Sequence, residues 1–193
     1  MHAAKEAYAL GAKIIAVSDV SGGLFNPDGI NISELVRYVK ENKVVVGFPG
    51  AEAIASDEVL FLDCDVLAPC ALDGVINSTN CNRVIAKIIV EGANGPLTIN
   101  ASEELHNKGY FIIPDILANG GGVVVSYFEW VQDIVWLFWS EDEVRKKLRT
   151  IMYRSYDTVF DFHNEKKVDL RISAMAVALK RLEKAMKLRG QAW

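Results

Sequence analysis

The sequence contains little cysteine and little histidine, and neither residue type is arranged as a metal site. Its 193 residues include three cysteines, Cys64, Cys70 and Cys81, an odd number with no Cys-x-x-Cys spacing. Such cysteines are expected to be reduced thiols that are partly buried and pack as small hydrophobic side chains. The three histidines are scattered along the chain and do not complete a zinc ligand set with them. The sequence therefore predicts no metal.

The chain also lacks an excess of positive charge and a long apolar run. Its formal net charge is −4, which provides no basic surface for nucleic acid or for an anionic membrane. No apolar run reaches the roughly 18 residues that a membrane-spanning helix needs. The segment Met1–Glu6 carries charges of both signs and lacks the apolar centre of a signal peptide. We therefore expect a cytoplasmic protein that binds neither nucleic acid nor membrane.

Hydrophobic residues make up 51% of the sequence, enough for one domain with a packed core and a smaller appendage. Up to residue 118, short apolar segments alternate with helical patterns. Four of these segments are predicted strands: Ile14–Val17, Val66–Ala68, Ile88–Val90 and Phe111–Ile113. Short, continuously apolar strands separated by helices are typical of a parallel sheet that is covered on both faces. Residues 1–118 are therefore predicted to form an α/β core.

Helix signals dominate the remainder of the chain. Ser140 with Glu143 has the pattern of a capping box, and Asp169 can cap a last helix. That last helix carries apolar residues at helical spacing, at Met175, Leu179, Leu182 and Met186. In the preceding part of the chain, Asn100 is expected to cap a further helix. Residues 119–193 are therefore predicted to form a helical tail.

The most informative stretch lies at the start of this tail, where three glycines follow Asn119 directly. Consecutive glycines add no packing, and a fold keeps them where another group must approach the backbone closely. The N–H groups of the helix that begins there would face that group. A flexible surface loop is the alternative interpretation. Asn119 and Ser126 favour a site, because these short hydrogen-bonding side chains lie about two helical turns apart on one face.

Three stretches of the sequence together resemble the glutamate dehydrogenases of the hexameric type. They are Pro114–Trp130, Val90–Thr98, and Ala16–Asp19 with Gly22–Gly29. The similarity runs from residue 1 to about residue 190 and corresponds to the C-terminal, dinucleotide-binding part of the family's chain. Two departures are small: Gly120 stands where the family usually has alanine, and Cys70 interrupts a usual Pro-Ala-Ala-Leu. The resemblance implies a Rossmann-like, doubly wound, mainly parallel sheet.

The resemblance also implies which residues hold the cofactor. The adenosine ribose would be bound by Asp19, and the nicotinamide side by the backbone around Ala71 and by Asn94 and Asn119. An acid at the end of such a strand accepts hydrogen bonds from ribose hydroxyls. A turn or cap residue is the alternative for Asp19. A carboxylate at this position repels a 2′-phosphate, which favours NAD over NADP and leaves NADP possible.

The glycine motif of dinucleotide-binding folds is missing from the chain. No Gly-x-Gly-x-x-Gly occurs, and counting back about 20 residues from Asp19 reaches the start of the sequence. The first strand and the phosphate-binding turn are therefore expected to lie upstream of Met1.

For the substrate, the resemblance implies that Ser126 bonds the distal carboxylate of L-glutamate and that Val123 lines the side-chain pocket. The lysine and aspartate that handle protons in the family lie in its N-terminal half, so no catalytic residue is assigned here. The charged residues that could be considered instead are interpreted as surface or capping residues: Lys87, Lys108, Asp115 and Asp133.

The expected function is the cofactor-binding part of an oxidoreductase that converts L-glutamate to 2-oxoglutarate and ammonium with NAD(P). A homo-oligomer is expected for the complete enzyme, and the isolated chain is expected to be inactive. Two alternatives remain: a non-catalytic fragment or interaction module, and a part of a leucine, phenylalanine or valine dehydrogenase. The run Val125–Trp130 favours the glutamate type.

Overall fold

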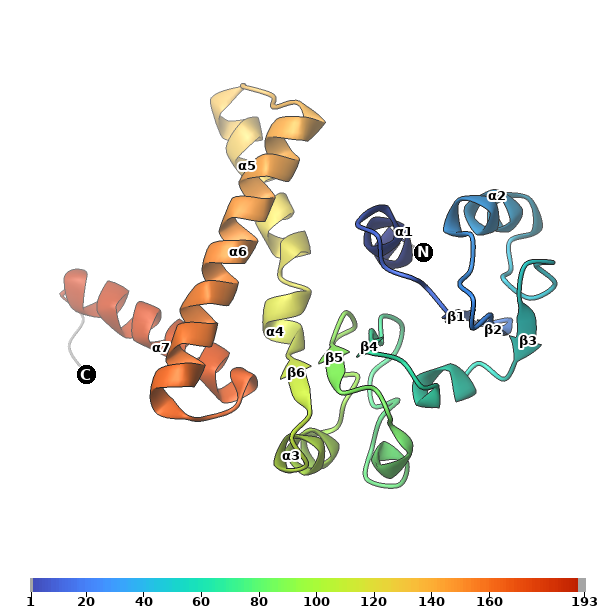
Figure 1. Cartoon of the computed structure of the whole chain (residues 1–193). Helices are drawn as coiled ribbons and strands as arrows, with labels where there is room; N and C mark the ends of the chain where they lie inside the picture. Colours follow the sequence, from blue (N-terminus) through green and yellow to red (C-terminus); the bar gives the residue numbers. More distant parts are fainter. Residues whose placement is uncertain (1, 191–193) are drawn as a thin grey trace. The chain divides into compact units, whose positions relative to one another are not determined.

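The computed structural model describes residues 2–190, which form two compact units. The first unit contains the described residues up to Leu67 together with Asn82–Lys87. The second contains Ala68–Cys81 and the described residues from Ile88 onward. Each unit has a hydrophobic core of its own, so each is described by itself. Figure 1 shows the elements of both units in sequence colours.

The first unit is built on an antiparallel sheet. Its strands lie in the order β1 (Ala16–Asp19), β2 (Gly22–Phe25) and β3 (Glu52–Ile54), and each neighbouring pair is antiparallel. The unit also contains α1 (His2–Ala9), α2 (Ile32–Asn42), the 3-10 turn η1 (Glu58–Phe61) and β4 (Val66–Leu67). The buried side chains of its core are Leu24, Ile30, Ile32, Leu35, Val45 and Phe48.

The first strand differs from its prediction. The sequence pattern placed it at residues 14–17 in a parallel sheet, whereas β1 is Ala16–Asp19 and pairs antiparallel with β2. A two-residue turn, Val20–Ser21, connects the two strands and sets Asp19 opposite Gly22. Gly22 has a φ of 145°, and a Cβ there would lie 2.7 Å from Val46 Cγ2. Strand β2 therefore requires glycine at its first position, although glycine is uncommon in strands. This requirement explains why the sequence shows no strand signal at β2.

The second unit contains the parallel strand pair that the sequence predicts. β5 (Ile88–Val90) and β6 (Phe111–Ile113) are parallel neighbours, with Val90 opposite Ile113. Helix α3 (Ile99–Asn107) connects them, and the 3-10 turn η2 (Cys81–Arg83) precedes β5. The predicted cap of α3 at Asn100 is wrong. Thr98 caps this helix, since its backbone is still extended and its Oγ1 accepts the Ala101 N–H at 3.4 Å.

Helices alone follow β6 in the described residues. They are α4 (Asp115–Ala118), α5 (Gly121–Val135), α6 (Glu141–Lys166) and α7 (Leu170–Leu188). Ser140 and Glu143 form the predicted capping box of α6, and Asp169 Oδ1 accepts the Ile172 N–H at 2.9 Å as the predicted cap of α7. Helix α6 packs against both α5 and α7 (Figure 1).

The last helix reaches back to the segment that follows β6. Leu170 and Ala174 of α7 pack in one buried cluster with Val159 of α6 and Leu117 of α4. The first turns of α7 are therefore positioned beside the segment that follows β6. In the part of the chain that the structure describes, no helix combines the length and apolar character needed to span a bilayer.

Candidate functional site

The turn that follows β5 is bound closely to a second loop of the same unit. The N–H groups of Gly92 and Ala93 both donate to the carbonyl oxygen of Pro69, at 3.0 and 2.9 Å. Cys70 therefore lies beside Gly92, and exposed Ala71 comes one residue later. A Cβ on Gly92 would lie 2.5 Å from Cys70 Sγ, so the close approach of the two loops requires glycine.

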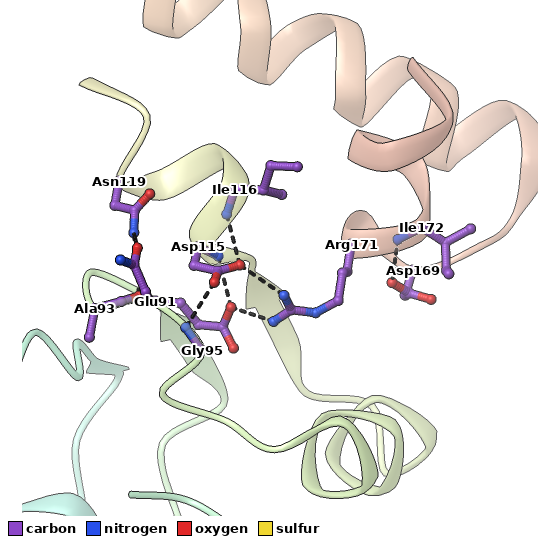
Figure 2. A network of polar contacts seen from close by, with 10 residues as sticks. Glu91, Ala93, Gly95, Asp115, Ile116, Asn119, Asp169, Arg171 and Ile172 are labelled. Carbon is purple, nitrogen blue, oxygen red and sulfur yellow. Dashed lines mark hydrogen bonds and ion pairs between the residues drawn. The ribbon is translucent and has the colours of Figure 1, made fainter. Parts of the chain in front are cut away.

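Two of the predicted cofactor residues contact each other at this turn. Asn119, which follows α4, donates from Nδ2 to Asn94 Oδ1 at 2.7 Å and to the Ala93 carbonyl oxygen at 3.4 Å (Figure 2). Asn94 is exposed and Asn119 is partly buried. Among residues 2–190, no hydrogen bond is made by Asn94 Nδ2 or Asn119 Oδ1. The pair therefore presents one amide donor and one amide oxygen to a ligand.

A charged cluster lies close to this pair, beside Asn119 (Figure 2). Glu91 directly follows β5, Asp115 begins α4 after β6, and Arg171 is in the first turn of α7. Arg171 Nη1 bonds Asp115 Oδ1 at 2.8 Å, and Arg171 Nη2 bonds Glu91 Oε2. The Asp115 N–H donates to the same Glu91 oxygen at 2.8 Å. One cation thus joins the acids that follow two neighbouring parallel strands.

Burial and the local donors give the two carboxylates opposite pKa shifts. Glu91 is fully buried, and this burial raises its pKa although the Asp115 N–H and Arg171 favour the charged form. Burial also opposes ionisation of Asp115, but the N–H groups of Gly95 and Ile116 and the guanidinium of Arg171 outweigh it and lower the pKa of Asp115. The Arg171 pKa is raised despite burial, because both carboxylates stabilise its charge.

The interpretation of Asp115 as a surface or capping residue needs correction. Asp115 does begin α4, but its side chain also accepts the Gly95 N–H at 2.8 Å and forms an ion pair with Arg171. Glu91 and Arg171 were not singled out in the sequence at all. A usable signal was present, because an acid follows each of two apolar strands within two residues, and the ends of parallel neighbours meet at one edge of a sheet.

Asp19, in the first unit, has partners close to it in the fold. Its Oδ1 accepts the Ser21 N–H at 2.7 Å and the Ser21 hydroxyl at 2.5 Å, and its Oδ2 accepts the Val45 N–H at 3.1 Å. Asp19 is thus a turn residue of the β1–β2 hairpin. A carboxylate offers about four acceptor positions, so one acceptor position stays available to a ribose hydroxyl.

The predicted substrate residues lie on the exposed side of α5. Val123 is 77% exposed, and Ser126 is exposed one turn further along the helix. A Cβ added to Gly122 would meet nothing within 4 Å, so packing within the described residues does not require this glycine. Residues 2–190 contain no group of three His, Cys, Asp or Glu side chains that could hold a metal ion.

The structure defines an α/β protein with polar side chains gathered just beyond two parallel neighbouring strands. In open sheets of this class, that edge is where ligands bind.

The family model for Glutamate/Leucine/Phenylalanine/Valine dehydrogenases matches residues 1–190, and the chain therefore belongs to this family. It is 48% identical over 181 residues to the glutamate dehydrogenase of Thermotoga maritima, covering 94% of this chain and 44% of that relative.

Solved structures agree with this assignment. The hetero-hexameric glutamate dehydrogenase of Thermus thermophilus in its leucine-bound form matches with a TM-score of 0.88 and 35% identity, over 96% of this chain and 44% of that one. The glutamate dehydrogenase of Peptoniphilus asaccharolyticus matches with a TM-score of 0.81 and 33% identity, over 97% of this chain and 44% of that one. The chain spans less than half the length of these relatives.

Proposed function

We propose that this chain is the cofactor-binding part of an amino-acid dehydrogenase of the glutamate type, with NAD as the preferred cofactor. The complete enzyme would convert L-glutamate to 2-oxoglutarate and ammonium and would assemble as a homo-oligomer. Membership in the family supports the oxidoreductase class. The choice of glutamate rests on the similarity to glutamate dehydrogenases and on the run Val125–Trp130.

The Asn94–Asn119 pair is the observation that carries this proposal. Its free amide donor and free amide oxygen match the hydroxyls of a ribose or the carboxamide of nicotinamide, which both donate and accept. Bound NAD would take the hydride from the substrate carbon. The asparagine pair would fix the orientation of the nicotinamide side, and the backbone near Ala71 would line it.

The substrate roles are proposed for α5. Ser126 would donate a hydrogen bond to the distal carboxylate of glutamate, and Val123 would contact the methylene groups of the side chain. The exposure of both residues leaves room for a ligand on this face. A neutral hydroxyl does not balance a carboxylate charge, so a cation from outside these residues is required.

Cofactor binding to the 193-residue chain tests the proposal directly. Titration with NADH, followed by NMR of ¹⁵N-labelled chain, should shift the side-chain amide signals of Asn94 and Asn119 and the backbone signal of Ala71. Asn94→Ala and Asn119→Ala should each weaken binding about tenfold, the equivalent of one lost hydrogen bond. Asn107→Ala, which removes an exposed asparagine at the end of α3, serves as the matched control. Signal changes that are equal in all three variants would contradict the proposed site.

We also propose that the chain alone does not turn over glutamate. No acid or base within it is assigned to proton transfer, and it spans 44% of the Thermotoga relative. A steady-state assay should therefore detect no NADH formation from glutamate and NAD. NADH formation that disappears in Ser126→Leu would show a complete active site in this chain and would overturn this part of the proposal.

Exposed apolar side chains support a second candidate, a module that functions by association. On α5 and the segment after it, Trp130, Trp136 and Phe138 are all exposed, and on α7 so are Leu179 and Leu182. Large exposed apolar surface can mark contact with another protein surface. Analytical ultracentrifugation with a dye for apolar surface tests it, and a monomer that binds no dye would argue against it.

A further inference from the structure

We propose that Arg171 of α7 is a positioning residue for the Asn94–Asn119 pair, acting through Glu91 and Asp115. The inference rests on the proposed function of that pair as a cofactor contact. Arg171 reaches neither asparagine directly, so its effect is exerted through the two carboxylates that it bonds.

Both ends of the turn that carries Asn94 are attached to the charged cluster (Figure 2). Glu91 begins the turn and bonds Arg171 through Oε2. Gly95 ends the turn, and its N–H donates to Asp115 Oδ2 at 2.8 Å. Asp115 in turn bonds Arg171 through its other oxygen, at 2.8 Å. Asn94 therefore lies in a segment whose two flanks are both held by one guanidinium.

The same cluster also sets the position of Asn119. The Asn119 N–H donates to the Asp115 carbonyl oxygen at 3.0 Å, which places Asn119 at the end of the short helix that Asp115 begins. Because Asp115 connects to Gly95 on one side and to Asn119 on the other, a movement of Asp115 would separate the two asparagines. Arg171 restrains Asp115 in that central position.

The chemistry of the cluster requires arginine. Two carboxylates that follow adjacent strands repel each other, and one planar guanidinium can donate to both at once in a fixed geometry. Glu91 is fully buried, and its second oxygen, Oε1, has no hydrogen-bond partner among the described residues. Without the guanidinium, Glu91 would keep a single donor, the Asp115 N–H. A lysine at position 171 would supply the positive charge but would not donate to both carboxylates in the fixed geometry of a guanidinium.

NMR of the ¹⁵N-labelled 193-residue chain, without cofactor, tests the positioning role first. In Arg171→Met, the chemical shifts of the Gly95 backbone amide and of the Asn119 side-chain amide should change. They should move toward the values of amides that donate no hydrogen bond to another protein group. Arg171→Lys should give an intermediate shift. Arg181→Met, an exposed arginine of the same helix, is the control and should leave these signals unchanged.

A paired variant separates positioning from general stabilisation. Glu91→Gln combined with Arg171→Met removes the uncompensated buried charge, so thermal stability should recover relative to Arg171→Met. NADH affinity should stay about tenfold below that of the original chain, because the link through Asp115 is still missing. Full recovery of affinity together with stability would show a merely structural role and would overturn the inference.

The remaining outcomes are also decisive. Unchanged Gly95 and Asn119 signals in folded Arg171→Met contradict the inference, and if that variant does not fold, Arg171→Lys and the paired variant provide the same readout. If the original chain binds no NADH, the proposed function fails, whereas the amide signals still decide whether Arg171 positions the pair.

Discussion

The two units use acidic residues at strand ends in different ways. In the first unit, Asp19 ends β1 of an antiparallel hairpin, and Ser21, two residues away, supplies two of its three donors. In the second unit, Glu91 and Asp115 follow parallel strands, and their shared partner Arg171 lies 80 and 56 residues further along the chain. The hydrogen bonds of Asp19 are mainly to a residue close to it in sequence, whereas the contacts of Glu91 and Asp115 with Arg171 require the helical tail to be packed in place.

This difference has a consequence for stability. Loss of the Asp19 contacts should disturb the hairpin and little else, because its donors lie within the first unit. Loss of the Arg171 contacts should affect β5, β6, α4 and α7 together, because Glu91 follows β5 and bonds Ile113 of β6, while Asp115 and Arg171 belong to α4 and α7.

Arg171→Met should lower the free energy of unfolding of the second unit by about 3 kcal/mol, since removing one partner of a buried ion pair leaves an uncompensated charge. Denaturant unfolding followed by hydrogen exchange measures this loss and assigns it to residues. Arg181→Met should change little. Equal loss of exchange protection in β1 and β2 would contradict the contrast between the units.

Gly92→Ala should destabilise the second unit by about 2 kcal/mol, because the added methyl group overlaps Cys70 Sγ and overpacking costs roughly this much. Cys70→Ala in the same chain should restore most of the loss, as measured in a double-mutant cycle. Gly122→Ala is the control, since a Cβ there meets nothing within 4 Å and helix propensity favours alanine. No coupling between positions 70 and 92 would show that the loops relax without cost.

A feature of the fold could be predicted from the sequence where the residues that form it lie close together along the chain, but not where they lie far apart. Strands β5 and β6 and the caps Ser140 and Asp169 could be predicted, because their signals lie within a few residues. The hairpin partner of β1 could not, because a strand that begins with two glycines has no strand signal. The Arg171 cluster could be predicted only in part, since its two acids follow neighbouring strands but Arg171 reaches them only through the packing of α7.

The residues of the candidate site also divide into those that the sequence could predict and those that it could not. That Asn94 and Asn119 lie together follows the general rule that residues beyond the ends of neighbouring parallel strands meet at one edge of a sheet. Their assigned roles, and those of Asp19, Ala71, Val123 and Ser126, stay predictions that ligand binding must test. The charged cluster beside the pair was missed because charged residues near turns are usually solvated, whereas Glu91 is fully buried.

Asp19→Ser tests the first unit and the choice of cofactor together. If Asp19 holds the ribose 2′-hydroxyl, NADH affinity should fall about tenfold relative to NADPH affinity, the effect of one charge-assisted hydrogen bond. Any damage to the hairpin weakens both cofactors alike, so the ratio of the two dissociation constants is the quantity to measure by NMR titration. Asp28→Ser removes an exposed acid of the same unit and should leave the ratio unchanged. An unchanged ratio in Asp19→Ser would leave Asp19 as a turn residue only.

The smallest expected effect is the pH dependence of the second unit, because its two carboxylates act in opposite directions. The Asp115 pKa is lowered from 3.8, so the stability that Asp115 contributes is present above that value and is lost as pH falls through the lower folded pKa. The Glu91 pKa is raised from 4.5, so its contribution is present below that value and is lost as pH rises through the higher folded pKa. Between these two values both contributions are present, so the stability that the pair provides should be greatest there and should fall on either side.

Two neutral variants separate these contributions. Glu91→Gln should abolish the loss of stability above pH 4.5. Its free energy of unfolding, measured with denaturant at several pH values, should therefore increase relative to that of the original chain as pH rises toward neutrality. Asp115→Asn should instead remove the loss on the acid side of 3.8. Glu129→Gln, which changes an exposed carboxylate of α5, is the control. A Glu91→Gln profile parallel to that of the original chain would mean that the buried Glu91 carboxylate does not make stability depend on pH, and the contrast with the Asp19 hairpin would then be lost.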